Sequence, residues 1–119
     1  MIKNLAPDIM RQRLLIEGFY KIEVNPGVIE RYFQALTERL SLKMYSKPII
    51  FSPGGEGKSE NQGYDAFVPL IDSGISVYIW SNRKFFSGII YTCKPFDEQM
   101  AFEVTKRSFD MDDAVKWSF

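Results

Sequence analysis

The sequence predicts a two-layer α+β sandwich, in which two helices cover one face of a largely antiparallel sheet. Several short segments alternate apolar and polar residues, as half-buried strands do, and two longer segments repeat apolar residues at helical spacing. The middle strands follow one another without intervening helices, which favours an antiparallel sheet. We expect the order β-α-β-β-β-α-β in a single domain over residues 1–119, with residues 1–10 as an N-terminal arm.

The first half of the chain is predicted to hold a strand over residues 13–22 and a helix that runs from Pro26 to about Leu40. Asn25 is the expected N-cap of that helix, because its side chain can accept a backbone hydrogen bond and Pro26 suits the first helical position. The helix presents one apolar stripe, which consists of Ile29, Phe33, Leu36 and Leu40.

The second half is predicted to hold strands over residues 48–51, 65–71, 75–80, 85–92 and 115–119. Residues 81–84 form an expected turn, and a helix follows Asp97 as its N-cap. Pro69 predicts an edge or a bulge in its strand. Tyr78 and Trp80 are expected on the sheet face that the helices leave uncovered, where a partner subunit or a ligand would cover them.

Residues 52–64 are expected to form a loop, because they are rich in glycine and polar residues. Gly57-Lys58-Ser59 matches the end of a phosphate-binding loop, but Ser52 stands where that motif needs its first glycine. A connecting loop is therefore favoured over a nucleotide site.

The composition excludes several classes of function. Lys plus Arg equals Asp plus Glu at 15 each, so no overall field favours nucleic acid or an acidic membrane surface. The chain has no His, which removes the commonest general base and metal ligand, and no metal site is expected. Its single Cys cannot form an internal disulfide. With no signal-peptide pattern and no long apolar run, we expect a cytoplasmic protein.

One stretch carries a specific pattern. Residues 72–80 read Asp-Ser-Gly-Ile-Ser-Val-Tyr-Ile-Trp, and a later strand ends in Tyr-Thr-Cys at Cys93. The pattern resembles the core of the prokaryotic S-adenosylmethionine decarboxylases, approximately Glu-Ser-His-hydrophobic-Ser/Thr-Ile-His-Thr-Trp-Pro-Glu and then Phe-Thr-Cys-Gly. The spacings from Ser73 to Trp80 and to Cys93 fit without a gap. The specific part spans residues 70–93, and weaker similarity extends over most of the chain.

The resemblance implies a self-processing chemistry. In that family the Ser hydroxyl attacks the preceding carbonyl, an ester forms, and β-elimination leaves a pyruvoyl cofactor that acts as an electron sink for decarboxylation. It implies that Ser73 is the pyruvoyl precursor, with cleavage after Asp72, and that Cys93 is a proton donor. Family members of this length usually form homodimers with the site near the interface, and the ligand-binding positions here would be Trp80, Asn82 and Ser76.

The departures from the family pattern concern the same site. Gly74 replaces the His that follows the Ser, and Tyr78 replaces the His that assists processing. Asn82 replaces the acid that holds the ribose, and Asp65 replaces a Ser that assists processing. A Tyr hydroxyl has a pKa near 10 against about 6.5 for His, so Tyr78 would be a poor general base at neutral pH.

Three hypotheses follow. The favoured one is a non-processing relative, with a pocket for S-adenosylmethionine or a related amine or amino acid of polyamine metabolism. The alternative is an active pyruvoyl-dependent decarboxylase that cleaves between Asp72 and Ser73. The third is a structural or interaction domain, in which Ser73 belongs to an ordinary tight turn, Cys93 is a small apolar residue, and Tyr78 and Trp80 only pack.

Overall fold

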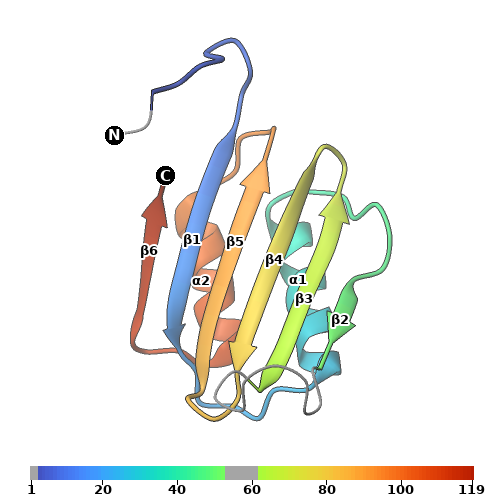
Figure 1. The fold of residues 1–119 in the computed structure, drawn as a ribbon, viewed down its shortest axis with the longest axis vertical. Helices are drawn as coiled ribbons and strands as arrows, with labels where there is room; N and C mark the ends of the chain where they lie inside the picture. Colours follow the sequence, from blue (N-terminus) through green and yellow to red (C-terminus); the bar gives the residue numbers. More distant parts are fainter. Residues whose placement is uncertain (1–2, 53–61) are drawn as a thin grey trace.

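The computed structural model describes residues 3–52 and 62–119 as a six-stranded sheet with two helices. The strands lie in the order β2-β3-β4-β5-β1-β6, and every neighbouring pair is antiparallel. Figure 1 shows both helices behind the sheet, which confirms the α+β fold class. The elements are β1 Gln12–Phe19, α1 Pro26–Arg39, β2 Ile49–Phe51, β3 Gly63–Leu70, β4 Ser73–Trp80, β5 Phe85–Thr92, α2 Glu98–Phe109 and β6 Ala114–Ser118.

The observed order is β-α-β-β-β-β-α-β, which has one strand more than β-α-β-β-β-α-β, although each of the six strand segments was predicted. The short segment β2 takes a place of its own in the sheet because Ile49 to Phe51 pair with residues 65–67. The expected loop over residues 52–64 also ends early, since Gly63 and Tyr64 already belong to β3 and pair with β4. Residues 53–61 lie outside the described residues. They include Gly57-Lys58-Ser59, the segment that was compared with a phosphate-binding loop.

Both helices begin where their capping residues predict. The Asn25 side chain accepts a hydrogen bond from the Val28 amide at 3.0 Å, and Asp97 accepts one from the Met100 amide at 3.0 Å. These bonds satisfy amides that have no partner within the helix. The caps therefore fix the two helix starts beside the sheet.

The core lies between the helices and the sheet. On the strands it is formed by alternate residues, among them Leu14, Ile16, Val68, Ile75, Val77, Phe86 and Ile90. Three aromatic rings join the two layers, because Tyr32 of α1 lies 5.8 Å from Phe86 and 5.0 Å from Phe109 of α2, measured between ring centroids. The Tyr32 hydroxyl is hydrogen-bonded to Thr105 Oγ1 at 2.8 Å.

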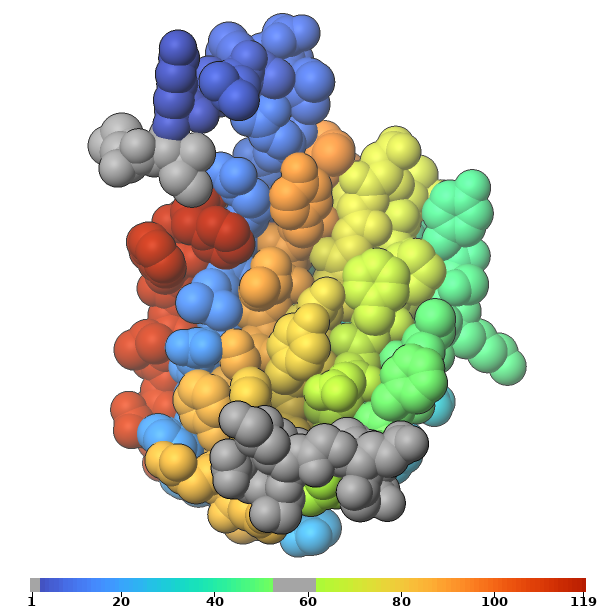
Figure 2. All heavy atoms as spheres, in the orientation of Figure 1, coloured from blue at the N-terminus to red at the C-terminus, as the bar shows by residue number. Residues whose placement is uncertain are grey.

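Figure 2 shows the opposite side of the sheet, called the open face below. Many of the side chains exposed on it are apolar. Strand pairing assigns its residues, because directly paired residues point to the same side of a sheet. Its apolar members include Leu15, Phe19, Ile49, Phe51, Phe67, Tyr78, Trp80, Phe85, Ile89, Tyr91, Val115 and Trp117. Trp117 is 65% exposed and Phe51 64%. Tyr78 and Trp80 thus lie on the uncovered face, as the sequence predicted.

Candidate functional site

Ser73 is the first residue of β4 and follows a tight connection from β3. Leu70 pairs with Ser73, so only Ile71 and Asp72 form the turn between the two strands. Asp72 has φ 59°, in the left-handed region that non-glycine residues seldom adopt, although Asp tolerates it better than most. The peptide bond between Asp72 and Ser73 therefore lies at a sharply bent position at one end of the sheet.

Ser73 and Cys93 come together at this end. The Ser73 Oγ accepts a hydrogen bond from the backbone amide of Cys93 at 3.1 Å. Cys93 follows the last residue of β5 and is exposed. The contact places the two residues that the resemblance identifies as precursor and proton donor beside each other, although they are separated by 20 positions in sequence.

Tyr78 does not join them. Ser73 has the strand parity of the core residues Ile75 and Val77, whereas Tyr78 has the opposite parity and lies on the open face. Among the described residues, no titratable side chain is hydrogen-bonded to the Ser73 hydroxyl. The structure thus brings Asp72, Ser73 and Cys93 together and leaves Tyr78 and Ser76 farther along β4.

Tyr78 belongs instead to a polar row that crosses the open face. It pairs with Asp65 of β3 on one side and with Ser87 of β5 on the other, and Ser87 pairs with Glu17 of β1. The Ser87 hydroxyl donates a hydrogen bond to Glu17 Oε2 at 2.8 Å. The sequence did not predict this contact between Glu17 and Ser87, although strand alternation already separated Glu17 from the core residues.

Trp80 lies at the far end of β4 from Ser73. At roughly 3.3 Å per residue, the Cα atoms of these two residues are about 23 Å apart, so one small ligand on one chain cannot contact both. Asn82 follows Trp80 in the turn between β4 and β5 and belongs to the same end.

At that end Trp80 lines a hollow of about 270 Å³, together with Phe19, Arg83 and Phe85. The ring of Phe85 lies 5.3 Å from that of Phe19 and 5.4 Å from that of Trp80, measured between centroids. Three strands thus place their aromatic residues side by side, which gives a surface on which a flat ring can stack. Phe19 and Phe85 were not predicted, since only the strand register shows that Trp80, Phe85 and Phe19 follow one another across three strands.

Gly74 is the position at which the resembling family has His. A β-carbon at Gly74 would lie 2.9 Å from Cε1 of the Phe67 ring, so this ring lies against the glycine backbone. Phe67 itself is 42% exposed on the open face. The space that a side chain at position 74 needs is thus taken up by an aromatic ring from β3.

Two further findings concern metals and membranes. In residues 3–52 and 62–119, no three His, Cys, Asp or Glu side chains come close enough to hold a metal ion. None of the helices in this described part is both long and apolar enough to span a membrane.

Comparison with known proteins identifies the fold. Neither family models nor curated proteins give a match to the sequence. Among solved structures, the chain is similar to the crystal structure of the adenosylmethionine decarboxylase from Aquifex aeolicus VF5, with a TM-score of 0.73 and 15% sequence identity. The match covers 93% of this chain and 89% of that chain. The protein therefore has the fold of an adenosylmethionine decarboxylase.

Proposed function

We propose that this protein is a relative of the S-adenosylmethionine decarboxylases that does not cleave itself and that binds a small molecule. The ligand class is S-adenosylmethionine or a related amine or amino acid, and a cytoplasmic role in polyamine metabolism belongs to the proposal. Fold similarity, the spacing of Ser73, Trp80 and Cys93, and the aromatic hollow support it.

The observation that carries the non-processing part is the environment of Ser73. Its oxygen accepts a bond from the Cys93 amide, and Tyr78, which replaces the family's His, lies on the other face of the sheet. A Ser hydroxyl needs a positioned base to become a nucleophile. Because no described side chain is hydrogen-bonded to Ser73 as that base, the site does not fit formation of a pyruvoyl group.

The aromatic hollow at the end of β4 is the proposed ligand site. Trp80, Phe85 and Phe19 offer ring faces, which attract both flat heterocycles and cations. The adenine ring of S-adenosylmethionine suits such a surface, and Arg83, which also lines the hollow, suits the carboxylate of this ligand. Asn82 in the adjoining turn retains a hydrogen-bonding side chain where the family has an acid.

The open face supports the proposed homodimer. Exposed apolar side chains in this number mark an interface, and they lie on both sides of the polar row that crosses the face. A second copy packed against it with its strands reversed would bring the Trp80 end of one chain toward the Ser73 end of the other. Such a dimer would shorten the distance that separates the two groups of predicted site residues within one chain.

Two measurements test the proposal. Intact mass under denaturing conditions should show one species near 13.8 kDa that persists on incubation. Calorimetric titration with S-adenosylmethionine should give saturable heat, which Trp80→Ala abolishes. Tyr45→Ala, a change at an exposed aromatic residue outside both the hollow and the open face, should leave the heat intact. Absence of heat at millimolar ligand would leave the fold assignment standing but remove the ligand proposal.

The second candidate function is the self-cleaving, pyruvoyl-dependent decarboxylase. Two observations favour it, namely the left-handed conformation of Asp72 at the bond to be cut and the contact between Ser73 and Cys93. Two fragments that separate between Asp72 and Ser73 in the mass spectrum would establish this function and refute the first. Ser73→Ala should then give a single uncleaved species.

A further inference from the structure

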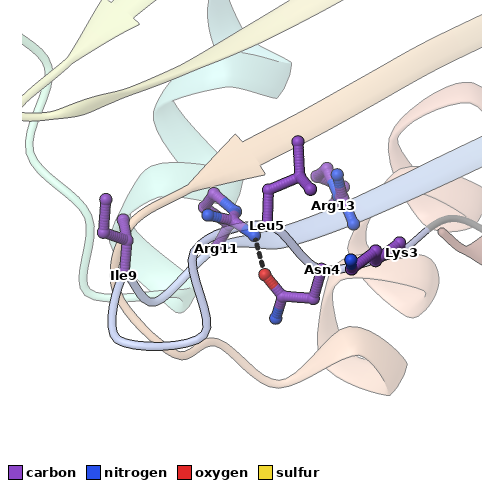
Figure 3. Close-up of a pocket in the computed structure, with 6 residues that line it drawn as sticks. All are labelled: Lys3, Asn4, Leu5, Ile9, Arg11 and Arg13. Carbon is purple, nitrogen blue, oxygen red and sulfur yellow. Dashed lines mark hydrogen bonds between the residues drawn. The ribbon is translucent and has the colours of Figure 1, made fainter.

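We propose that a hollow between the N-terminal arm and the start of β1 binds a small phosphate-bearing molecule. The hollow has a volume of about 350 Å³, which lies within the range of small-molecule sites. Figure 3 shows the six residues that line it, which are Lys3, Asn4, Leu5, Ile9, Arg11 and Arg13. This inference does not depend on the proposed function, because the lining includes neither Ser73 and Cys93 nor the aromatic hollow.

The charge of the lining favours an anion. Three of its side chains are cationic, and none is a carboxylate. The arm does contain Asp8, but Asp8 is exposed and does not line the hollow. Since the whole chain carries 15 basic and 15 acidic residues, this concentration is local and does not reflect a generally basic surface. A multivalent anion gains most from several converging cations.

Arg11 is held in place before any ligand arrives. Its Nη2 donates to Asn4 Oδ1 at 2.6 Å (Figure 3), and its Nη1 donates to the Ala6 carbonyl at 3.2 Å. The Asn4 oxygen also accepts from the Ala6 amide at 3.1 Å, so the arm folds back around the guanidinium. A fixed guanidinium loses less conformational freedom on binding than a mobile one.

Arg13 is fixed in a different way. Its Nε donates to the main-chain oxygen of Phe119 at 2.8 Å, and its guanidinium lies 5.5 Å from the centroid of the Phe119 ring. A guanidinium has five N–H donors, so both arginines retain donors for the oxygens of a ligand. Planar forks of this kind match phosphate oxygens in pairs, which distinguishes them from a lysine acting as a point charge.

The remaining residues suggest how the rest of the ligand is accommodated. Lys3 takes part in no hydrogen bond or ion pair within the described chain, so its ammonium is available to a second anionic oxygen. Leu5 is 84% exposed and Ile9 53% exposed beside the cations. These apolar side chains suit the organic portion of a phosphate ester.

The test is an NMR titration that follows the Nε–Hε signals of the arginine side chains. Inorganic pyrophosphate and ribose 5-phosphate should shift the Arg11 and Arg13 signals saturably, whereas ribose should not. Arg11→Gln or Arg13→Gln should weaken binding at least tenfold. Arg39→Gln, which removes the same charge at the end of α1 and outside the hollow, should leave the affinity unchanged.

Two more variants keep the result decisive if Arg11→Gln unfolds the arm. Lys3→Gln preserves every hydrogen bond of the arm and should still weaken binding, and Arg11→Lys should bind less tightly than wild type despite its equal charge. The proposal is overturned if neither probe shifts the two arginines saturably. It also fails if Arg39→Gln weakens binding as much as Lys3→Gln does, because the attraction would then be a general effect of net charge.

Discussion

The hydroxyl oxygen of Ser73 accepts a hydrogen bond of 3.1 Å from the backbone amide of Cys93. The bond joins the start of β4 to the residue that follows the end of the neighbouring strand β5. The bond makes the Ser73 side chain part of the sheet's hydrogen-bonded framework. We expect Ser73→Ala to lower the free energy of unfolding by about 0.5 to 1 kcal/mol, the usual net value of one such bond. Urea denaturation measures it. Ser76→Ala, on the other face of the same strand, serves as the control. An equal loss in the free energy of unfolding there would contradict the stabilising role of the bond between Ser73 and Cys93.

A charged residue in the middle of the open face should prevent self-association. Leu15 and Ile89 are paired neighbours at its centre, and a second copy would remove both from water. Leu15→Glu or Ile89→Lys should therefore convert a dimer to a monomer, because an unpaired buried charge is costly. Sedimentation velocity distinguishes the two states. Leu5→Lys in the arm is the control, because it places a charge at an exposed apolar position outside the open face and should leave the dimer intact. A wild-type chain that is already monomeric would refute the proposed dimer.

Gly18 should tolerate no side chain. A β-carbon there would lie 2.8 Å from the Asp113 carbonyl oxygen and 2.8 Å from the Ala114 β-carbon, so the backbone before β6 would have to move. We expect Gly18→Ala to destabilise the fold by about 1 to 3 kcal/mol, as overpacking does.

The control for that prediction is the same substitution at Gly27, near the start of α1. There the nearest atoms belong to side chains, at 3.2 Å from Arg31 Nη1 and Asn25 Oδ1, and alanine favours a helix. Gly27→Ala should be neutral or stabilising by up to about 1 kcal/mol. Thermal denaturation of both variants checks the contrast, which would be contradicted by equal losses.

Stability should fall at alkaline pH because of Tyr32. Burial raises the pKa of the Tyr32 hydroxyl well above its ordinary value of 10.0. Its stabilising contribution is complete below pH 10 and is lost as the pH rises further, because the unfolded chain then releases a proton that the folded chain keeps. The free energy of unfolding should decrease by up to roughly 1.4 kcal/mol per pH unit from this group. Denaturation of wild type and Tyr32→Phe between neutral and alkaline pH measures the difference.

The Tyr32→Phe variant separates two effects. Near neutral pH it should be less stable than wild type by about 1 kcal/mol, since it loses the hydrogen bond to Thr105. Above the ordinary tyrosine pKa its stability should decline less steeply than that of wild type, because one titrating group is gone. Parallel pH profiles of the two proteins would contradict the role of burial at Tyr32.

Local features of the sequence predicted most of the fold. Asn25 and Asp97 marked the helix starts, and alternation assigned Tyr78 to the uncovered face, because these signals depend only on neighbouring residues. The pairing of strands is a property of distant segments, so the contact between Glu17 and Ser87, 70 positions apart, was not predictable in the same way. The aromatic hollow was missed for that reason.

The candidate site was predictable only in part. Spacing within residues 70–93 identified Ser73 and Cys93, which the structure brings into contact. The strand predicted over residues 75–80 already placed Trp80 at the strand end away from Ser73, and the structure confirms this separation, because β4 runs extended from Ser73 to Trp80. The position of Phe67 over Gly74 was hidden, because it depends on the register between β3 and β4.

The place of β1 in the sheet has a consequence for how the chain folds. This strand, near the N-terminus, pairs on one side with residues 85–92 and on the other with residues 114–118. The sheet is therefore incomplete until residues 114–118 have been synthesised, and its central pairings close long stretches of chain. Proteins dominated by such distant pairings fold slowly, so refolding should be slower than for a helical protein of equal length.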